Sequence, residues 1–319
     1  VFGGRDRMDE RYDMIRFVRD KRYKLVINYN MDKPYSQYTN TAEKSPVQIE
    51  LNRLAKEGVL PDDAAWVTRK NKPLMEFYDL ETDPHELNNL FTDQDNQIIE
   101  DPKYTDIRKH HFKAYMDWYL EITDLGLIPE AELNRLEDEY EYRSRIYKGI
   151  ERKHRAFRKQ LHGLIPVLFG PPISAYPKDL SLQRQFAALD KVWTEGAKSD
   201  LPSLRYWAIV GLSRLEVGHP SLIKAMDDDS PVVRLEAARA LVGYSLQREK
   251  ALGILIAGLQ DDDEWVRLQA ATALDEIGEL ARPAIPQLKE ALNDKHNKYV
   301  VRVANRTLNV LEGTDNQVR

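Results

Sequence analysis

The chain has 319 residues, of which 42% are hydrophobic and 31% charged, so it has enough apolar material for a core and enough length for about two domains. The formal net charge of −5 argues against nucleic acid as a partner, and the longest apolar run, Leu161–Phe169, is too short to span a membrane. The absence of cysteine excludes disulfides, thiolate nucleophiles and zinc ribbons.

The N-terminal region predicts a small antiparallel sheet. Residues 3–10 are polar, contain two glycines and are expected to form a loop. Residues 14–19 and 23–29 are β-branched or aromatic, and Asp20-Lys21-Arg22 separates them. This arrangement predicts a β-hairpin with a short connection.

Three further elements are expected before residue 82. Residues 31–46 contain prolines and small polar residues, which indicates a long loop. Residues 49–56 are expected to form a helix that ends at Gly58, because glycine commonly takes the left-handed conformation after a helix. Residues 76–80 predict a short strand.

Asp83, Pro84 and Glu86 fit the start of a helix. Asp83 is suited to the N-cap, Pro84 to the first helical position, and Glu86 to the third position of a capping box. With His85, the segment also has the D-x-H-E spacing of a metal-binding arrangement. Capping is the favoured interpretation.

Two helices are predicted in the next region. Residues 107–122 carry apolar side chains at helical spacing. His110-His111 lies on this helix, but adjacent side chains point about 100° apart and are poorly placed to chelate one ion. Residues 125–129 are expected to end the helix, residues 130–160 to form a long charged helix, and residues 164–173 to mark a domain boundary.

The C-terminal region repeats itself. Residues 229–241 align with residues 262–274, and residues 298–308 and 204–212 are weaker copies. Amphipathic segments lie between the copies, which predicts stacked helical hairpins. We expect an aspartate to cap each second helix and an arginine one turn later to reach an aspartate of the adjoining repeat.

The pattern D-x-x-x-V-R-x-x-A-A-x-A-L in this region resembles HEAT repeats. HEAT modules commonly bind partners through a concave surface, so the resemblance implies a possible protein partner. Aromatic residues recur near the starts of the second helices. Core packing is the favoured role of Trp207, whereas Trp265 and Tyr299 are candidate partner-binding residues.

A second resemblance covers the N-terminal region. Residues 4–16, 18–29 and 77–90, above all Tyr78-Asp-Leu-x-x-Asp-Pro-x-Glu-x-x-Asn-Leu90, resemble the C-terminal subdomain of bacterial type I sulfatases, with the sulfamidase-like members as the nearest relatives. The resemblance implies a mostly α chain with a small α+β subdomain, an antiparallel sheet plus a helix, at residues 1–125. Helical linker residues 126–180 would follow, and then about four HEAT-like repeats at 181–314.

The sulfatase resemblance implies hydrolysis of a sulfate ester or sulfamate. Members of that family use formylglycine, made from a C/S-x-P-x-R motif, and a calcium ion. This sequence has no such motif, and its opening Val1-Phe2-Gly3-Gly4 has no initiator Met and no signal peptide. We therefore expect a piece of a longer protein, with formylglycine and calcium in a missing N-terminal domain, and periplasmic or extracellular residence.

The same resemblance places the segment Arg5–Glu10 near the mouth of the substrate pocket. It implies that Arg5 and Arg7 bind sulfate or carboxylate groups and that Asp6, Asp9 and Glu10 line the same wall. The alternative is that these charges form salt bridges that tie the segment to the missing domain.

Three hypotheses for the whole chain follow. The first is the C-terminal portion of a sulfuric ester or sulfamate hydrolase that acts on a sulfated glycan or small ester, with a HEAT interaction module. The second is a non-catalytic HEAT-repeat scaffold. The third, a bilin-lyase-like HEAT enzyme, has no support outside the repeats.

Overall fold

The computed structural model describes residues 1–73, 75–92, 99, 101–122, 124–143, 145–146, 191, 193–213 and 218–318. The described residues up to Gly126 form one compact unit, and those from Leu127 onward form a second. A small antiparallel sheet lies in the first unit and helical repeats lie in the second, which confirms the predicted fold class. The predicted boundary at 164–173 falls outside the described residues.

The sheet has four antiparallel strands in the order β1 (Phe2–Met8), β2 (Arg11–Arg19), β3 (Tyr23–Asn28) and β4 (Met75–Asp79). The hairpin of β2 and β3 and the strand β4 confirm the predictions. The predicted loop at residues 3–10 is wrong, because most of it is strand β1. Its glycines provide space: a Cβ atom at Gly3 would lie 2.5 Å from the Phe17 ring.

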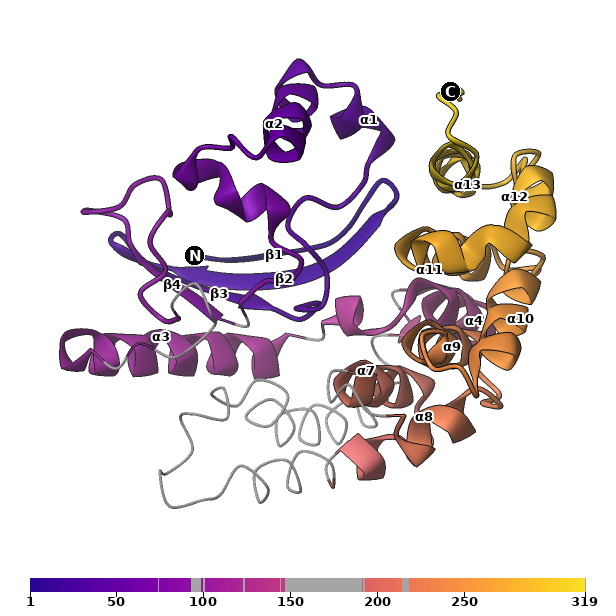
Figure 1. The fold of residues 1–319 in the computed structure, drawn as a ribbon. Coiled ribbons are helices and arrows are strands. Elements are labelled where there is room, and N and C mark those ends of the chain that lie inside the picture. The colour runs from indigo at the N-terminus through magenta and orange to yellow at the C-terminus, as the bar shows by residue number, and fades with distance from the viewer. Residues whose placement is uncertain are drawn as a thin grey trace. The chain divides into compact units, whose positions relative to one another are not determined.

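Both faces of this sheet carry helical segments, whereas β1 is an edge strand in which no residue is buried, which explains why it has no apolar alternation. Helix α3 (Pro102–Glu121) packs against β2 and β3 on one face (Figure 1). On this face the Phe77 ring stacks on Tyr23 and meets the His111 ring edge-on. Tyr115, Met116 and Tyr119 of the predicted helical stripe are buried, which confirms that these three belong to the core.

The segment between β3 and β4 lies on the other face of the sheet. It contains helices α1 (Asn40–Glu43) and α2 (Pro46–Glu57) and the 3-10 helix η1 (Asp62–Thr68), and Figure 1 shows α1 and α2 on the side of the sheet away from α3. Helix α2 ends at Gly58 in a left-handed conformation, as predicted. The contacts on this face include a buried ion pair between Lys72 and Asp13.

The predicted helix start at Asp83 is wrong. The Asp83 carboxylate accepts hydrogen bonds from the backbone N–H groups of Leu87 and Asn88, but no helix follows. Glu86 takes a φ of 57°, and its carboxylate lies 2.6 Å from the Lys24 ammonium on β3. This ion pair with a distant residue holds Glu86 away from the N-cap, so the segment forms a turn.

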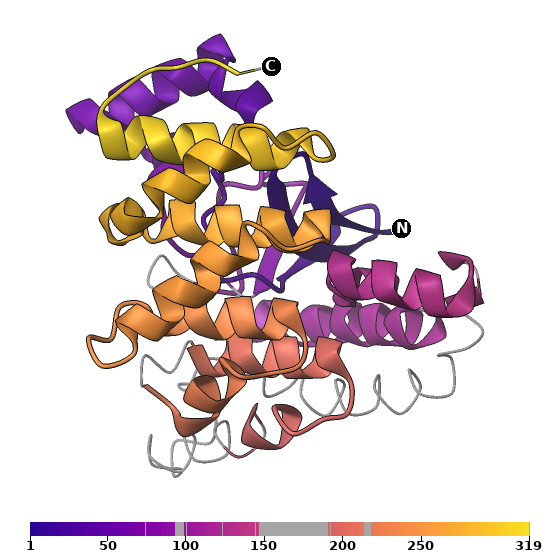
Figure 2. The same ribbon diagram turned by 90° about the vertical axis from the view of Figure 1, so that its right-hand side faces the viewer.

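The second unit contains helix α4 followed by the repeats. Figure 2 shows the repeat helices stacked one after another. The helices are α4 (Glu130–Tyr140), α7 (Pro202–Ser213), α8 (Pro220–Ala225), α9 (Pro231–Leu241), α10 (Arg248–Gly258), α11 (Glu264–Glu276), η4 (Gly278–Ala284), α12 (Ile285–Ala291) and α13 (Lys298–Glu312).

Helix α4 is shorter than the predicted helix at 130–160. Glu141 takes a φ of 68°, a left-handed conformation that ends the helix after Tyr140. Residues 147–160 lie outside the described residues. Although the sequence placed α4 in a linker, its contacts assign it to the unit that holds the repeats.

The expected connections between repeats are confirmed at two positions. Arg205 pairs with Asp228 and Arg267 pairs with Asp294, in each case an aspartate of the next repeat. The expected aspartate cap is found at α11, where Asp263 accepts from two backbone N–H groups. It is wrong for α9 and α13, which begin at a serine and an asparagine N-cap. No described helix has the length and hydropathy of a membrane span.

Candidate functional site

The residues predicted to bind substrate lie on β1 and in the turn that follows it. Arg5 donates to the Asp13 carboxylate at 2.8 Å, and Asp13 also pairs with the buried Lys72 ammonium at 2.7 Å. Asp6 points to the opposite face and lies 2.8 Å from the Arg16 guanidinium. Strand alternation therefore separates Arg5 from Asp6, and both form ion pairs within this chain.

Arg16 is the centre of the charge cluster on the face covered by α3. Its guanidinium donates two hydrogen bonds to Asp124, at 2.7 and 2.8 Å, and its side chain is 5% exposed. Burial alone lowers the pKa of Arg16, but the carboxylates of Asp124 and Asp6 raise it above the usual value. The cluster joins β1 and β2 to the segment after α3.

The remaining three predicted residues lie at the turn between β1 and β2. Arg7 donates to the Glu10 carbonyl at 3.3 Å and lies over the Tyr12 ring. Asp9 has a φ of 53°, and Glu10 is buried, with its carboxylate accepting from the Asn40 backbone N–H. Substrate binding by these residues stays a prediction.

A cleft of about 790 Å³ lies in the first unit and was not predicted from the sequence. Its lining residues come from Tyr35, η1, β4 and the turn after β4. Trp66 is 41% exposed, and its ring meets the Tyr35 ring edge-on with centroids 6.4 Å apart. Arg69 is half-buried in the same lining and forms no hydrogen bond or ion pair through its side chain with any described residue.

Glu76 of β4 holds the interior of this cleft in place. Its buried carboxylate accepts from Asn28 at 2.5 Å, from Tyr35 at 2.7 Å and from Tyr78 at 2.5 Å. Burial raises the pKa of Tyr35 and of Tyr78, and the neighbouring Glu76 charge raises both further. Both phenols therefore stay protonated and act as fixed hydrogen-bond donors.

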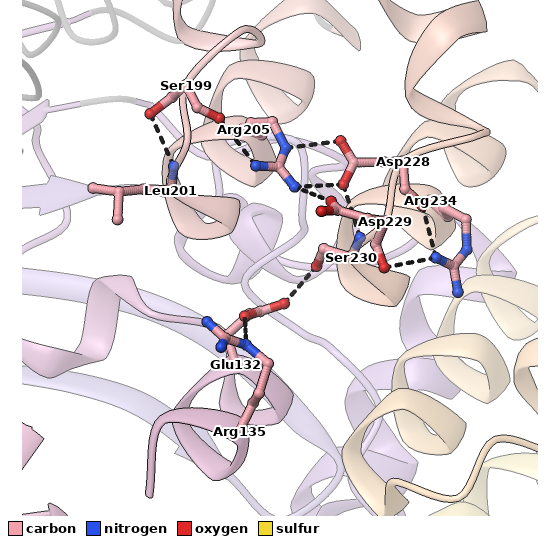
Figure 3. A network of polar contacts seen from close by, with 9 residues as sticks. All are labelled: Glu132, Arg135, Ser199, Leu201, Arg205, Asp228, Asp229, Ser230 and Arg234. Atoms are coloured by element: carbon pink, nitrogen blue, oxygen red, sulfur yellow. Dashed lines mark hydrogen bonds and ion pairs between the residues drawn. The ribbon is translucent and has the colours of Figure 1, made fainter. Parts of the chain in front are cut away.

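In the second unit, polar side chains attach α4 to the repeats (Figure 3). The Glu132 carboxylate is buried and accepts from the Ser230 hydroxyl at 2.5 Å and from Arg135 at 2.9 Å. Ser230 is the N-cap residue of α9, and the helix dipole favours a carboxylate there. Asn134 of α4 donates to Asp263, the N-cap of α11, at 3.3 Å.

The same network links neighbouring repeats. Arg205 of α7 donates to both Asp228 oxygens, at 2.8 and 2.7 Å, and to the Ser199 carbonyl. Arg234 donates to the carbonyls of Asp228 and Asp229. Burial raises the pKa of Asp228, but the hydrogen bonds from Arg205 and Ser230 outweigh it, so the pKa lies below its usual value.

The aromatic residues of the repeats have different environments. Trp207 is 2% exposed and its indole N–H donates to the Leu127 carbonyl at 2.8 Å, which confirms the expected core role. Trp265 and Tyr299 are half-buried in the first turns of α11 and α13. Tyr299 lies between the cations of Lys298 and Arg302. Partner binding by Trp265 and Tyr299 stays a prediction.

The described residues contain no group of three or more His, Asp or Glu side chains that could hold a metal ion. His111 contacts the Ile107 carbonyl through Nδ1 and lies 3.3 Å from Asp20 through Nε2, so it is part of the packing between α3 and the sheet. The described residues therefore do not fit a calcium site.

Comparison with known proteins finds two kinds of similarity in this chain. Residues 219–309 match the family model of HEAT repeats. HEAT repeats are therefore present within residues 219–309. The chain is also similar to sulfatases.

Two proteins of Formosa agariphila, each named Ulvan-active sulfatase, are similar to this chain. One is 35% identical over 133 residues, which cover 42% of this chain and 21% of the relative. The other is 34% identical over 92 residues, which cover 29% of this chain and 16% of the relative. The matched part of the chain thus spans about a fifth, or less, of the length of these sulfatases.

Proposed function

We propose that this chain is the C-terminal part of a sulfuric ester hydrolase that removes sulfate from a sulfated glycan. The observation that carries the proposal is the 35% identity to an Ulvan-active sulfatase over 133 residues. The antiparallel sheet packed on α3, together with the Tyr78–Leu90 segment that continues from β4, supports it.

We place the formylglycine nucleophile and the calcium ion in a part of the protein that precedes Val1. The chain has no cysteine and no C/S-x-P-x-R motif, and its described residues do not fit a calcium site. In a sulfatase, formylglycine supplies the nucleophile that attacks sulfur, and the metal stabilises the sulfate oxygens. We derive no chemical step from this chain.

The role proposed for this chain is to bind and orient the substrate. Arg7 and Asp9, at the turn between β1 and β2, are the predicted contacts to the anionic and hydroxyl groups of the substrate. The HEAT array holds α4 through Glu132 and Ser230, and we propose that its half-buried residues Trp265 and Tyr299 bind a protein partner. Periplasmic or extracellular residence is part of the same proposal.

The test is release of inorganic sulfate by the whole protein, measured by ion chromatography. The substrates are ulvan, an N-sulfated glycosaminoglycan and a small aryl sulfate. We expect release from at least one of them, and the preferred substrate identifies the bond as sulfate ester or sulfamate. Absence of release from all three, by a folded and metal-loaded protein, would contradict the proposal and favour the non-catalytic scaffold.

A further inference from the structure

We propose that the cleft lined by Tyr35, Trp66, Arg69 and Glu76 binds an oligosaccharide that carries sulfate or carboxylate groups. The cleft volume of about 790 Å³ lies within the range of about 300–1,000 Å³ that is typical of small-molecule sites. The choice of a saccharide rests on the proposed function, whereas the requirement for an aromatic contact and an anion comes from the lining residues.

The aromatic side of the cleft is suited to the C–H face of a sugar ring. Trp66 is 41% exposed, although a large indole is usually much more buried. Its ring is fixed by edge-to-face contact with Tyr35, and Tyr35 is fixed in turn by its hydrogen bond to Glu76. A rigid aromatic surface offers a large contact area at a low entropic cost.

Arg69 supplies the site for the anionic group. A guanidinium presents its donors in a fork that matches sulfate and carboxylate oxygens, and a buried guanidinium normally has such a partner. Arg69 is half-buried, yet among the described residues no carboxylate pairs with it. Glu86, a nearby carboxylate of the lining, is paired with Lys24, and Glu76 is held by three hydrogen bonds.

The remaining lining residues are suited to sugar hydroxyls. Asp62 and Asp63 are exposed in the first turn of η1, and Asn88 is exposed in the turn after β4. Carboxylate and amide oxygens accept hydrogen bonds from hydroxyl groups, and the negative charge of the two aspartates disfavours a ligand that carries only anionic groups. The lining therefore favours a ligand in which hydroxyls and anionic groups occur together.

The experiment measures oligosaccharide binding to the whole protein by isothermal titration calorimetry. The ligands are ulvan oligosaccharides before and after chemical desulfation, and a neutral cello-oligosaccharide. The variants are Trp66→Ala and Arg69→Gln, and the matched control is Lys70→Gln, which removes the same charge from the exposed neighbouring residue outside the cleft lining.

We expect Trp66→Ala to weaken binding of all ulvan ligands. Arg69→Gln should lower the affinity for the anionic ligands by about tenfold, and Lys70→Gln should leave the affinity unchanged. If desulfation of the ligand abolishes the effect of Arg69→Gln on affinity, Arg69 binds the sulfate group. If the effect persists after desulfation, Arg69 binds a carboxylate group of the ligand. Thermal melting checks that each variant is folded. If Trp66→Ala is unfolded, the affinity of Arg69→Gln still tests the cleft proposal.

Equal affinities for Arg69→Gln and Lys70→Gln would overturn the cleft proposal, as would the absence of binding by the parent protein. Sulfate release is recorded separately on the same preparations. If Arg69→Gln does not change oligosaccharide affinity and the protein still releases sulfate, only the cleft proposal is rejected. Cleft-dependent binding without sulfate release rejects the sulfatase proposal and leaves the cleft as a saccharide site.

Discussion

At the scale of single residues, the face of the sheet under η1 depends on one buried ion pair. The Lys72 ammonium and the Asp13 carboxylate have exposed fractions of 0% and 1% and lie 2.7 Å apart. Burial lowers the pKa of Lys72, and the Asp13 charge opposes that shift without cancelling it. Removal of one partner of such a pair leaves an uncompensated buried charge.

Lys72→Met is therefore expected to lower the free energy of unfolding by about 3–5 kcal/mol, because it removes the buried partner of Asp13 and leaves the partly exposed Arg5 as its hydrogen-bonded cation among the described residues. Urea unfolding of the whole protein measures it. Lys70→Met, two residues earlier and exposed, is the control and should change stability by less than about 0.5 kcal/mol. Equal losses of unfolding free energy in the two variants would show that the buried pair of Lys72 and Asp13 does not stabilise the fold.

A second residue-scale prediction concerns acid stability of the repeats. Burial raises the pKa of Asp294, but the Arg267 guanidinium 2.7 Å away and the backbone N–H groups of His296 and Asn297 lower it below 3.8. A carboxyl whose pKa is depressed in the folded state contributes stability above its unfolded pKa, and that stability is lost as pH falls through the folded value.

We therefore expect the unfolding midpoint of the parent protein to fall as pH drops below about 4, and the Arg267→Met variant to show a shallower fall from a lower starting value. Thermal unfolding from about pH 6 to about pH 2.5 measures both curves. Parallel curves for the two proteins would mean that Arg267 does not set the pKa of Asp294.

At the scale of elements, α4 is held to the repeats at the N-cap of α9. Ser230→Ala removes the hydroxyl that donates to the buried Glu132 carboxylate, so we expect a loss of about 1–3 kcal/mol in the free energy that keeps α4 docked. Hydrogen exchange should then quicken in residues 130–140 and much less in α13. The control is Ser221→Ala in α8. Similar hydrogen exchange of residues 130–140 in the two variants would show that Ser230 does not hold α4 to the repeats.

The elements with purely local signals were predictable. The β2–β3 hairpin, α2 with its Gly58 end, and the helix pairs of the repeats each follow from spacing within one segment. Strand β1 was not predictable, because it is an edge strand whose polar residues, such as Arg5, form ion pairs in place of an apolar face. The turn at Asp83 depends on Lys24, which lies far away in the sequence.

The candidate site was predictable only in part, for the same reason. The motif at Tyr78–Leu90 pointed to a sulfatase because it is contiguous in the sequence. Tyr35, Trp66 and Arg69 come from separate segments and line the cleft together with residues of β4. Neither the spacing nor the composition of the sequence predicts that these residues lie close together. Likewise, no sequence pattern linked Glu132 to Ser230.

At the scale of the whole molecule, the predicted substrate contact at the β1–β2 turn is expected to matter only in the complete protein. Arg7→Ala should raise the KM for a sulfated glycan by about tenfold with a smaller effect on kcat, because a lost binding contact acts mainly on affinity. Sulfate release measures both constants. Arg19→Ala, at the exposed end of β2, is the matched control. Identical constants for the two variants would remove Arg7 from the binding surface.

We propose that this chain completes a formylglycine sulfatase whose nucleophile lies in another part of the whole protein. The most direct measurement is peptide mass spectrometry of the whole protein after treatment with an aldehyde-reactive hydrazine. We predict one labelled peptide, outside residues 1–319, in which the first residue of a C/S-x-P-x-R motif is formylglycine. A protein without that motif, or with the motif unmodified in its native source, would contradict it.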